Sequence, residues 1–214
     1  MITDERITSY LHSLAGNDSE ICMTIEREAL RDGVPIIRKE MGGFLKTVLA
    51  VKKPKRILEI GTAVGYSSIL MSENIDEDAV ITTIENYDKR IPVAKANIKR
   101  AGKEDVITLL EGDAAVVLKE LEGPYDFIFM DAAKAQYIVI LPEILRLLEK
   151  DGILITDNVL QEGELVQSRY AVNRRDRTIH SRMREYLYAV THNENLKTSV
   201  IPLGDGITFS VKIN

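Results

Sequence analysis

The fold is decided by the segment Arg56-Ile57-Leu58-Glu59-Ile60-Gly61-Thr62-Ala63-Val64-Gly65-Tyr66-Ser67-Ser68. It begins as a short apolar run with no polar face, which is typical of a strand buried on both sides of a parallel sheet. Two glycines follow, and a helical pattern starts at Tyr66. A strand that ends at a glycine turn and continues as a helix leaves free backbone N–H groups at the helix N-terminus. The segment therefore predicts a strand, a ligand-binding turn and a helix.

The glycine turn indicates which kind of ligand would bind. Gly61 permits a tight turn and the close approach of a ligand to the backbone. The pattern is not the G-x-G-x-x-G of pyrophosphate binders, because Ala63 and Tyr66 occupy its second and third glycine positions. Glu59 is predicted to direct a carboxylate into the crevice at the carboxyl end of the strand. An acid there suits a cationic ligand better than a phosphate. The alternative is a glycine-bearing strand-to-helix turn without a ligand, which can have the same sequence pattern.

Length, charge and cysteine content bound the class of protein. At 214 residues the chain is expected to form one domain spanning 1–214. A net charge of -5 argues against a protein coated in nucleic acid, but it permits a local basic patch. The single cysteine, Cys22, allows no internal disulfide and fits a reducing compartment. The chain begins without the pattern of a signal peptide and has no apolar run long enough to span a bilayer. We therefore expect a soluble, cytoplasmic protein without a membrane partner.

The N-terminal residues 1–51 are predicted to form a helical cover. Apolar residues recur at helical spacing over 4–14, with Thr3 as a plausible N-cap. Ser19 is the expected N-cap of a second helix, which Asp32-Gly33 would end. A third helix is expected from about Ile37 to Val51.

Residues 56–214 alternate between strand and helix patterns. The predicted strands are 56–60, 79–85, 106–111, 127–131 and 153–156, and the clearest helices between them are 88–101 and 135–149. Gly102 and Gly152 stand where helix C-caps are expected. A helix over 176–192 precedes a hairpin of 198–203 and 207–213. The prediction is an α/β fold, a seven-stranded and mostly parallel sheet with helices on both faces and a C-terminal antiparallel hairpin. This arrangement resembles the Rossmann-like core of class I methyltransferases.

Acidic residues follow successive predicted strands, at the edge where open α/β sheets bind ligands. Glu85 ends the second strand and could accept hydrogen bonds from two ribose hydroxyls. Asp113 follows the third strand and is placed to reach an adenine amino group, while Ala114 could offer its backbone N–H. Each acid alone could equally be a solvated helix cap.

The next two strands end in a set of oxygen ligands. Asp131 ends the fourth strand, and Asp157-Asn158 ends the fifth. Two carboxylates and an amide around one point suit a hard cation such as Mg²⁺. A helix cap and a polar turn are the structural alternative.

These residues together resemble the cation-dependent O-methyltransferases, the caffeoyl-CoA and catechol O-methyltransferase-like enzymes. The resemblance covers nearly the whole chain, and its most specific part is Asp131-Ala132-Ala133-Lys134 paired with Asp157-Asn158 on the following strand. It implies that Asp131, Asp157 and Asn158 bind Mg²⁺ (or Mn²⁺ or Ca²⁺) and that Lys134 assists deprotonation of the acceptor hydroxyl. It also implies a homodimer. The residues implied to contact S-adenosylmethionine are Ile37, Glu59, Gly61, Gly65, Ser67, Glu85, Asp113, Ala114 and Asp131.

A basic stretch after the metal motif bears on the acceptor. Six arginines lie between positions 169 and 184, and they are Arg169, Arg174, Arg175, Arg177, Arg182 and Arg184. Their planar guanidinium groups suit phosphates, although a solvated helix face would also explain them. Within the family, the chain resembles the bacterial branch that methylates 5-hydroxyuridine in the tRNA anticodon. That resemblance implies that Arg174, Arg175 and Arg177 contact tRNA, with Tyr137 and Tyr170 as candidates for base stacking.

Two other functions remain open on the sequence. A small-molecule O-methyltransferase acting on catechols or hydroxycinnamoyl-CoA would use the same metal site, and its arginines could bind the phosphates of CoA. A non-catalytic cofactor-binding dimer is disfavoured because every catalytic position is occupied. A dinucleotide dehydrogenase is disfavoured by the missing glycine pattern.

Overall fold

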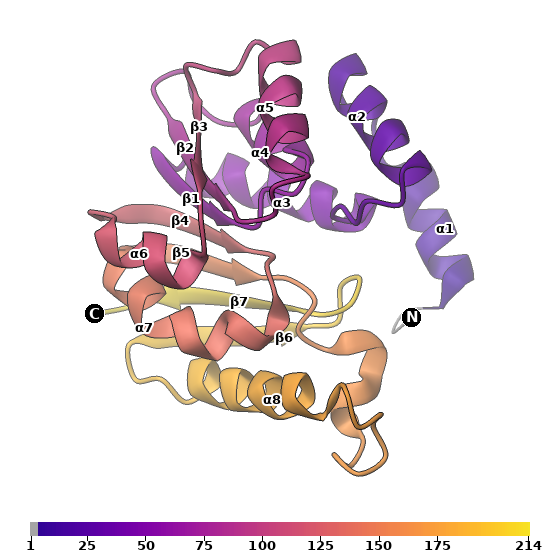
Figure 1. Cartoon of the computed structure of the whole chain (residues 1–214), viewed down its shortest axis with the longest axis vertical. Helices are drawn as coiled ribbons and strands as arrows, with labels where there is room; N and C mark the ends of the chain where they lie inside the picture. Colours follow the sequence, from indigo (N-terminus) through magenta and orange to yellow (C-terminus); the bar gives the residue numbers. More distant parts are fainter. Residues whose placement is uncertain (1–3) are drawn as a thin grey trace.

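A computed structural model describes residues 4–214, and within them seven strands form one sheet in the order β3-β2-β1-β4-β5-β7-β6 (Figure 1). The parallel strands are β1 (Arg56–Ile60), β2 (Val80–Glu85), β3 (Ile107–Glu111), β4 (Tyr125–Met130) and β5 (Leu148–Thr156). The hairpin of β6 (Leu196–Ile201) and β7 (Ile207–Lys212) joins β5 antiparallel. The predicted fold class is confirmed.

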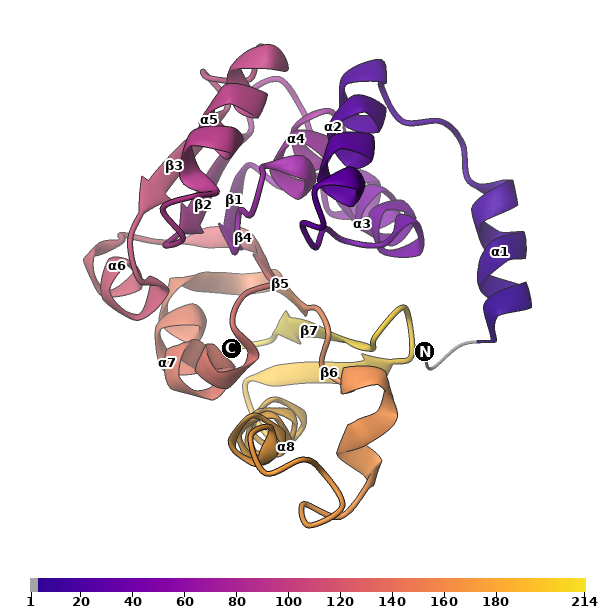
Figure 2. The same ribbon diagram turned by 45° about the vertical axis from the view of Figure 1, so that its right-hand side comes forward.

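Helices cover both faces of this sheet (Figures 1 and 2). One face packs against α2 (Glu20–Arg31), α3 (Lys39–Lys52), α4 (Tyr66–Ser72) and α5 (Ile91–Arg100). The other packs against α6 (Ala114–Glu120), α7 (Tyr137–Leu147) and α8 (Arg177–Thr191). Two short 3₁₀ segments, η1 (Lys134–Gln136) and η2 (Gln161–Val166), follow β4 and β5.

The two cores explain why the decisive segment has no polar face. Ile57 packs into the core under α3 and α4, whereas Leu58 and Ile60 pack into the core under α6 and α7. All three side chains are almost completely buried. Because β1 lies between β2 and β4, both of its faces and both of its edges are covered.

The element boundaries differ from the prediction by two residues or more at β4, β5 and β6, and β6 spans Leu196–Ile201 where 198–203 was expected. β5 begins at Leu148 instead of 153, so Gly152 lies inside the strand and is not a helix C-cap. A Cβ at Gly152 would lie 2.8 Å from the carbonyl oxygen of Glu149, which explains the glycine by close packing. β4 begins two residues before the predicted Phe127. Gly102, by contrast, follows α5 with a φ of 63°, as a helix C-terminus favours.

The first helix, α1 (Glu5–Leu14), stands apart from the sheet in both views (Figure 2). Its N-cap is Asp4, and the predicted cap Thr3 lies outside the described residues. The ring of His12 meets the carboxylate of Glu40 at 2.6 Å and ties α1 to α3. Its predicted apolar side is exposed and buries nothing. Among the described residues, no helix has the length and apolar character needed to cross a bilayer.

Candidate active site

A cavity of about 500 Å³ opens at the carboxyl ends of β1, β2 and β4. The turn after β1 forms its floor, where Gly61 adopts a φ of 103°. A Cβ at Gly61 would lie 1.9 Å from the carbonyl oxygen of Asp131, so only glycine lets these two turns touch. Residues predicted as cofactor contacts that line this cavity are Ile37, Gly61, Ser67, Glu85, Ala114 and Asp131.

Glu85 shapes the rim of the cavity through its carboxylate. One oxygen accepts a hydrogen bond from the backbone N–H of Ala63 at 2.7 Å, and the other accepts from the N–H groups of Asn86 and Tyr87, each at 2.9 Å. The side chain therefore fixes the turns after β1 and β2 while still lining the cavity. Gly65 does not line it, and its φ of 83° instead lets the chain enter α4.

Glu59 lies beneath the cavity and not in it, contrary to the prediction that it points into the crevice. The side chain is completely buried and accepts hydrogen bonds from the hydroxyls of Ser68 and Thr83. Among residues 4–214, no group donates a hydrogen bond to its buried Oε1. Burial raises the pKa of the Glu59 carboxyl, and the hydroxyl groups around it, including that of Ser67, lower it. A carboxylate below Ser67 still makes the cavity floor favourable for a positive charge.

Asp113 is also set back from the cavity, as the N-cap of α6. Its Oδ1 accepts a hydrogen bond from the backbone N–H of Ala115 at 2.8 Å, and its Oδ2 accepts from the side-chain amide of Gln136 at 3.2 Å. Gly112, Ala114 and Gln136 line the cavity around it, whereas Asp113 does not. The side chain that meets the cavity at this point is Gln136.

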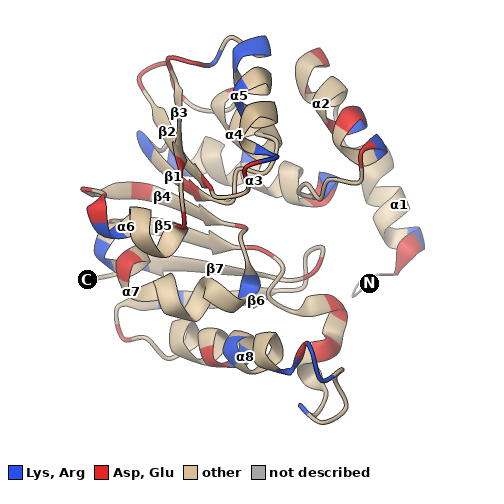
Figure 3. Cartoon of the chain, viewed as in Figure 1, with Lys and Arg blue, Asp and Glu red and all other residues tan. Residues whose placement is uncertain are grey.

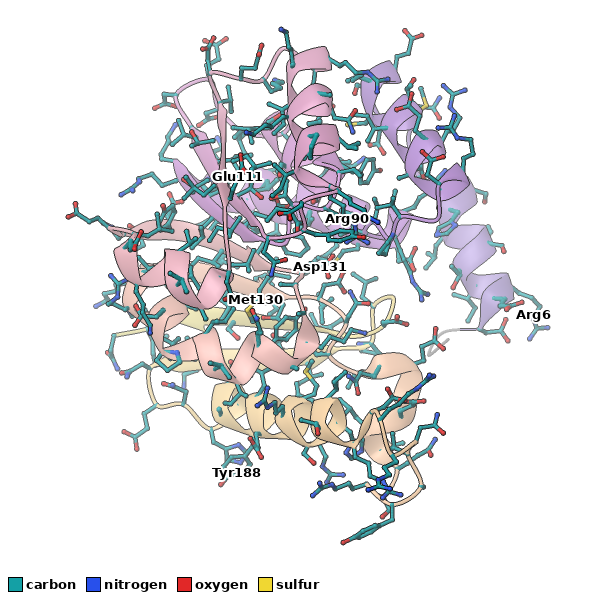
Figure 4. The ribbon with its side chains drawn as sticks, viewed as in Figure 1. Arg6, Arg90, Glu111, Met130, Asp131 and Tyr188 are labelled. Atoms are coloured by element: carbon teal, nitrogen blue, oxygen red, sulfur yellow. The ribbon has the colours of Figure 1, made fainter. Side chains whose placement is uncertain are left out.

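The residues predicted to bind a metal lie together at the wall of this cavity, which Asp131 and Asn158 line and Asp157 does not. The amide of Asn158 donates a hydrogen bond to Oδ1 of Asp131 at 3.2 Å, and the backbone N–H of Asn158 donates to Oδ1 of Asp157 at 2.6 Å. Asn158 holds this position with a φ of 59°. Asp131 lies near the centre of the molecule, between the two helical layers (Figure 4).

Burial makes ionisation of these two carboxyl groups costly. Desolvation raises the pKa of Asp131 to about 6, against the opposing effect of Lys134. Desolvation and then the charge of Asp131 raise the pKa of Asp157 to about 7. Within residues 4–214, no three His, Cys, Asp or Glu side chains gather as a metal site. Two carboxylates and an amide nevertheless fit a hard divalent cation, whose charge would offset their repulsion.

A second cavity of about 350 Å³ lies on the other side of Lys134. Lys134 lines both cavities and so stands between them. Four acidic side chains surround the second space, and its lining is Lys134, Gln161, Glu162, Glu164, Asp176, Ile179 and Asp205. Apart from Lys134, the sequence had indicated none of these residues as part of the site.

Tyr137 is not available for base stacking, and that prediction is wrong. Its ring is completely buried and packs edge-on against Tyr186 with the ring centroids 5.6 Å apart. Its hydroxyl accepts a hydrogen bond from the N–H of Ala132 and donates to the carbonyl oxygen of Asp157, each at 3.2 Å. The tyrosine therefore supports the two turns that carry the aspartates. Tyr170 is 81% exposed.

The six arginines divide into two groups. Arg169, Arg174 and Arg175 are exposed in the loop between η2 and α8, where Figure 3 shows basic residues beside the acidic η2. The other three bind backbone carbonyls: Arg177 those of Val172 and Tyr170, Arg182 that of Ala135, and Arg184 that of Leu165. Half of the predicted basic stretch therefore has a structural role.

Several residues of the larger cavity were missed by the sequence reasoning. Pro35 and Ile36 line it next to Ile37, and Tyr87 and Arg90 line it after β2. The guanidinium of Arg90 lies 5.4 Å from the centre of the Tyr87 ring, and Arg90 lines the same cavity as Asp131. Tyr87 and Arg90 follow the end of β2 closely, and this position could have indicated from the sequence that they lie at the ligand-binding edge of the sheet.

Known proteins resemble this chain in sequence and in structure. A sequence profile described as O-methyltransferase matches residues 13–213. A catechol O-methyltransferase of Niastella koreensis is 30% identical over 168 residues, which cover 76% of each protein. Caffeoyl-CoA O-methyltransferase 2 of Populus trichocarpa is 33% identical over 183 residues, covering 80% of this chain and 72% of the relative. An SAH-bound methyltransferase of Podospora anserina superposes with a TM-score of 0.87 at 27% identity, covering 98% of this chain and 95% of that chain.

Proposed function

The chain belongs to the O-methyltransferase family, and we propose that it is a cation-dependent member that methylates 5-hydroxyuridine at the wobble position of a tRNA anticodon. Its S-adenosylmethionine dependence follows from the family and from the SAH-bound structural relative. What we propose beyond the family is the tRNA acceptor and the divalent cation. Because tRNA is the substrate, we also propose that the protein acts in the cytoplasm.

The observation that carries the proposal is the exposed arginine loop beside the second cavity. Arg174 and Arg175 directly precede Asp176, which lines that cavity together with Lys134. In the part of the chain that the structure describes, Arg169 and Arg174 have no ion-pair partner. Guanidinium groups free of partners suit the phosphates of an RNA loop that lies across the opening.

The charges inside and outside the second cavity differ in sign. Glu162, Glu164, Asp176 and Asp205 line the inside. Arg38 lies 3.0 Å from Asp205 and 3.9 Å from Glu162, and Arg175 lies 3.4 Å from Asp176, so part of this charge is compensated. The carboxylates still outnumber the cations around this space, which disfavours a phosphate inside it. A uracil ring is neutral and offers an N3–H donor that these carboxylates can accept. A base turned into the cavity with its phosphates held outside by arginines matches this separation of charge.

The chain's own residues define the chemistry. Lys134 stands between the cavity for the methyl donor and the acidic cavity, so its side chain can meet the acceptor oxygen. A divalent cation held by Asp131, Asp157 and Asn158 would lower the pKa of the acceptor hydroxyl and orient it. Lys134 could accept the hydroxyl proton as a neutral amine or stabilise the oxyanion as an ammonium.

A small-molecule acceptor is the second candidate, and the relatives favour it. Their names give catechol and caffeoyl-CoA O-methyltransferases. A catechol presents two adjacent oxygens, as does 5-hydroxyuridine with its 5-hydroxyl and 4-carbonyl. For a CoA ester, the arginine loop would bind the phosphates of CoA outside the cavity.

The test is methyl transfer from labelled S-adenosylmethionine with Mg²⁺ to three acceptors, each with and without a chelator. The acceptors are tRNA carrying 5-hydroxyuridine, a simple catechol and caffeoyl-CoA. The proposal expects a far higher kcat/KM for the tRNA, abolished by the chelator. Efficient methylation of catechol or caffeoyl-CoA with an inert tRNA would make the small-molecule function primary.

A further inference from the structure

We propose that Arg38 determines which charge of an acceptor the second cavity favours, although its side chain lies outside that cavity. By neutralising Asp205, Arg38 keeps the space suited to a neutral acceptor ring. Without its guanidinium, the same space would select cationic acceptors. The inference rests on the proposed function, because it places the acceptor in the second cavity, and it adds a residue that controls the choice of acceptor.

Arg38 connects the N-terminal helices to the wall of the second cavity. It follows the segment 35–37, which lines the larger cavity, and directly precedes α3. Its Nη2 lies 3.0 Å from Oδ1 of Asp205, in the turn between β6 and β7, and 3.9 Å from Oε1 of Glu162 in η2. Asp205 and Glu162 line the second cavity, whereas Arg38 lines neither cavity. One guanidinium therefore acts on two carboxylates of the wall from outside the cavity.

The contact with Asp205 is the stronger of the two. The side chain of Asp205 is 12% exposed and that of Arg38 is 33% exposed, whereas that of Glu162 is 64% exposed. Solvent screens a partly buried pair at 3.0 Å less than an exposed pair at 3.9 Å. Within residues 4–214, Arg38 is also the only cation that forms an ion pair with Asp205. The neutralisation of the Asp205 carboxylate therefore depends on Arg38.

The backbone around Asp205 holds this residue at the cavity. The carbonyl oxygen of Asp205 accepts a hydrogen bond from the N–H of Leu160 at 2.9 Å, and that of Gly206 accepts one from the N–H of Val159 at 2.8 Å. A Cβ at Gly206 would collide with the side chain of Leu160, so the turn packs directly on the segment that follows β5. The loss of Arg38 would therefore leave the Asp205 carboxylate in place and without a counter-charge.

The charge balance of the second cavity makes it sensitive to this pair. Its lining contains four carboxylates and one ammonium, that of Lys134. Arg38 and Arg175 compensate carboxylates from outside, but Arg175 is exposed, so solvent screens its charge more strongly. Removal of Arg38 adds one uncompensated negative charge to the wall. That charge attracts a cationic acceptor and repels an anionic one, so the two affinities change in opposite directions.

Competition by two catechols of similar shape and opposite charge tests the inference. Dopamine ends in an ammonium group, and dihydrocaffeate ends in a carboxylate on a side chain of similar length. Each is titrated as a competitor of methyl transfer from labelled S-adenosylmethionine, with Mg²⁺, to the acceptor that the wild-type protein methylates. The ratio of the two inhibition constants measures the charge preference of the cavity. Calorimetric titration with S-adenosylhomocysteine measures separately whether the cofactor site is intact.

Arg38→Gln should shift this ratio at least about tenfold in favour of dopamine. Asp205→Asn should shift it in the opposite direction, because it leaves the guanidinium without its partner. The double variant should return close to the wild-type ratio, and Arg38→Lys should keep that ratio. The charge-matched control is Lys99→Gln, an exposed lysine that lines neither cavity, and it should leave the ratio unchanged. The affinity for S-adenosylhomocysteine should be the same in every variant.

A purely structural role of Arg38 predicts a different result. Both catechols would then bind more weakly by the same factor, and the ratio would not move. That outcome, or a shift of the same sign in Arg38→Gln and Asp205→Asn, would overturn the inference, as would the failure of both catechols to compete. A wild-type protein that methylates none of the three acceptors tested above would instead contradict the proposed function itself, on which this inference rests.

Discussion

The buried pair Asp131 and Asp157 is a cost to the fold that only the site explains. Both carboxyl groups are raised in pKa by desolvation, Asp157 also by the charge of Asp131. Each carboxyl group has a higher pKa in the folded protein than in the unfolded chain. Such a group lowers the free energy of unfolding only at pH values at which it is ionised in the unfolded chain. For Asp157 this cost is absent below about pH 4, grows as the pH rises, and is complete above the folded value of about 7.

Asp157→Asn should therefore stabilise the protein at pH 8 in the presence of a chelator, while abolishing methyl transfer. The amide keeps the acceptor for the Asn158 N–H and removes the buried charge. We expect a gain on the order of 2 kcal/mol at pH 8 and almost none at pH 4. Chemical denaturation at the two pH values measures it, with the exposed Asp105→Asn as the control. Equal or lower stability at pH 8 would show that the carboxylate is not destabilising.

Gly61→Ala should disrupt the site. The new Cβ would lie 1.9 Å from the carbonyl oxygen of Asp131, and the φ of 103° is unfavourable for alanine. We expect a loss on the order of 3 kcal/mol in the free energy of unfolding and no measurable binding of S-adenosylhomocysteine. The matched control is Gly43→Ala in α3, where a Cβ meets nothing within 4 Å. That variant should gain about 0.5 to 1 kcal/mol. Normal binding by Gly61→Ala would contradict the close approach.

Sequence reasoning predicted which residues surround the site better than it predicted what each side chain contacts. Asp131 and Asn158 were expected together because parallel strands end at one edge, and they are hydrogen-bonded. Glu59, Asp113 and Tyr137 were assigned to ligands, yet all three bind protein groups. Asp113 caps α6, which was the alternative that the sequence had left open. The partners of Glu59 and Tyr137 come from other elements, and these contacts depend on side-chain geometry that spacing does not encode.

At the scale of elements, periodicity predicted the strands and helices that build the sheet. The helix over 176–192 was expected from its pattern and is present as α8. The early start of β5 was missed because Leu148 continues an apolar helical pattern. The division of the arginines was also missed. Arg182 and Arg184 bind carbonyls of η1 and η2, and these contacts appear only once α8 is packed.

The arginine loop should carry the affinity for RNA. We expect Arg169→Gln, Arg174→Gln and Arg175→Gln together to weaken tRNA binding about 10- to 100-fold at moderate salt and to lower the salt slope by about two to three. Their binding of S-adenosylhomocysteine should not change. Filter binding over a series of salt concentrations measures both quantities. The charge-matched control is Lys99→Gln, Lys119→Gln and Lys150→Gln together, three exposed lysines that line neither cavity. An unaltered tRNA affinity in the arginine variant would remove the main support for an RNA acceptor.

At the scale of the whole molecule, α1 contacts α3 through His12 and Glu40 but leaves its own apolar side exposed. Ile7, Tyr10, Leu11 and Leu14 are each at least 44% exposed, although they share the apolar side of the helix. A face of this kind is typical of an interface. We propose that it contributes to a homodimer, as the family resemblance implies.

Leu11→Asp with Leu14→Asp should therefore yield a monomer. Light scattering after gel filtration should give twice 24.0 kDa for the wild type and 24.0 kDa for the variant. Val116→Asp, an exposed apolar position on α6, is the control and should leave the mass unchanged. A wild-type monomer would contradict the dimer, and a dimeric variant would place the interface elsewhere.

The two cavities draw their walls from different parts of the gene. The larger one is built mostly from residues 35–136, and the smaller one, Lys134 apart, from residues 161–205. With the acceptor in the smaller cavity, as proposed above, mutations in the last quarter of the gene would alter the acceptor while the inherited cofactor machinery stays intact. Natural selection could in this way recruit the same scaffold for new substrates by changing one contiguous coding segment. Exchange of that segment between diverged relatives would be the laboratory equivalent of such a history.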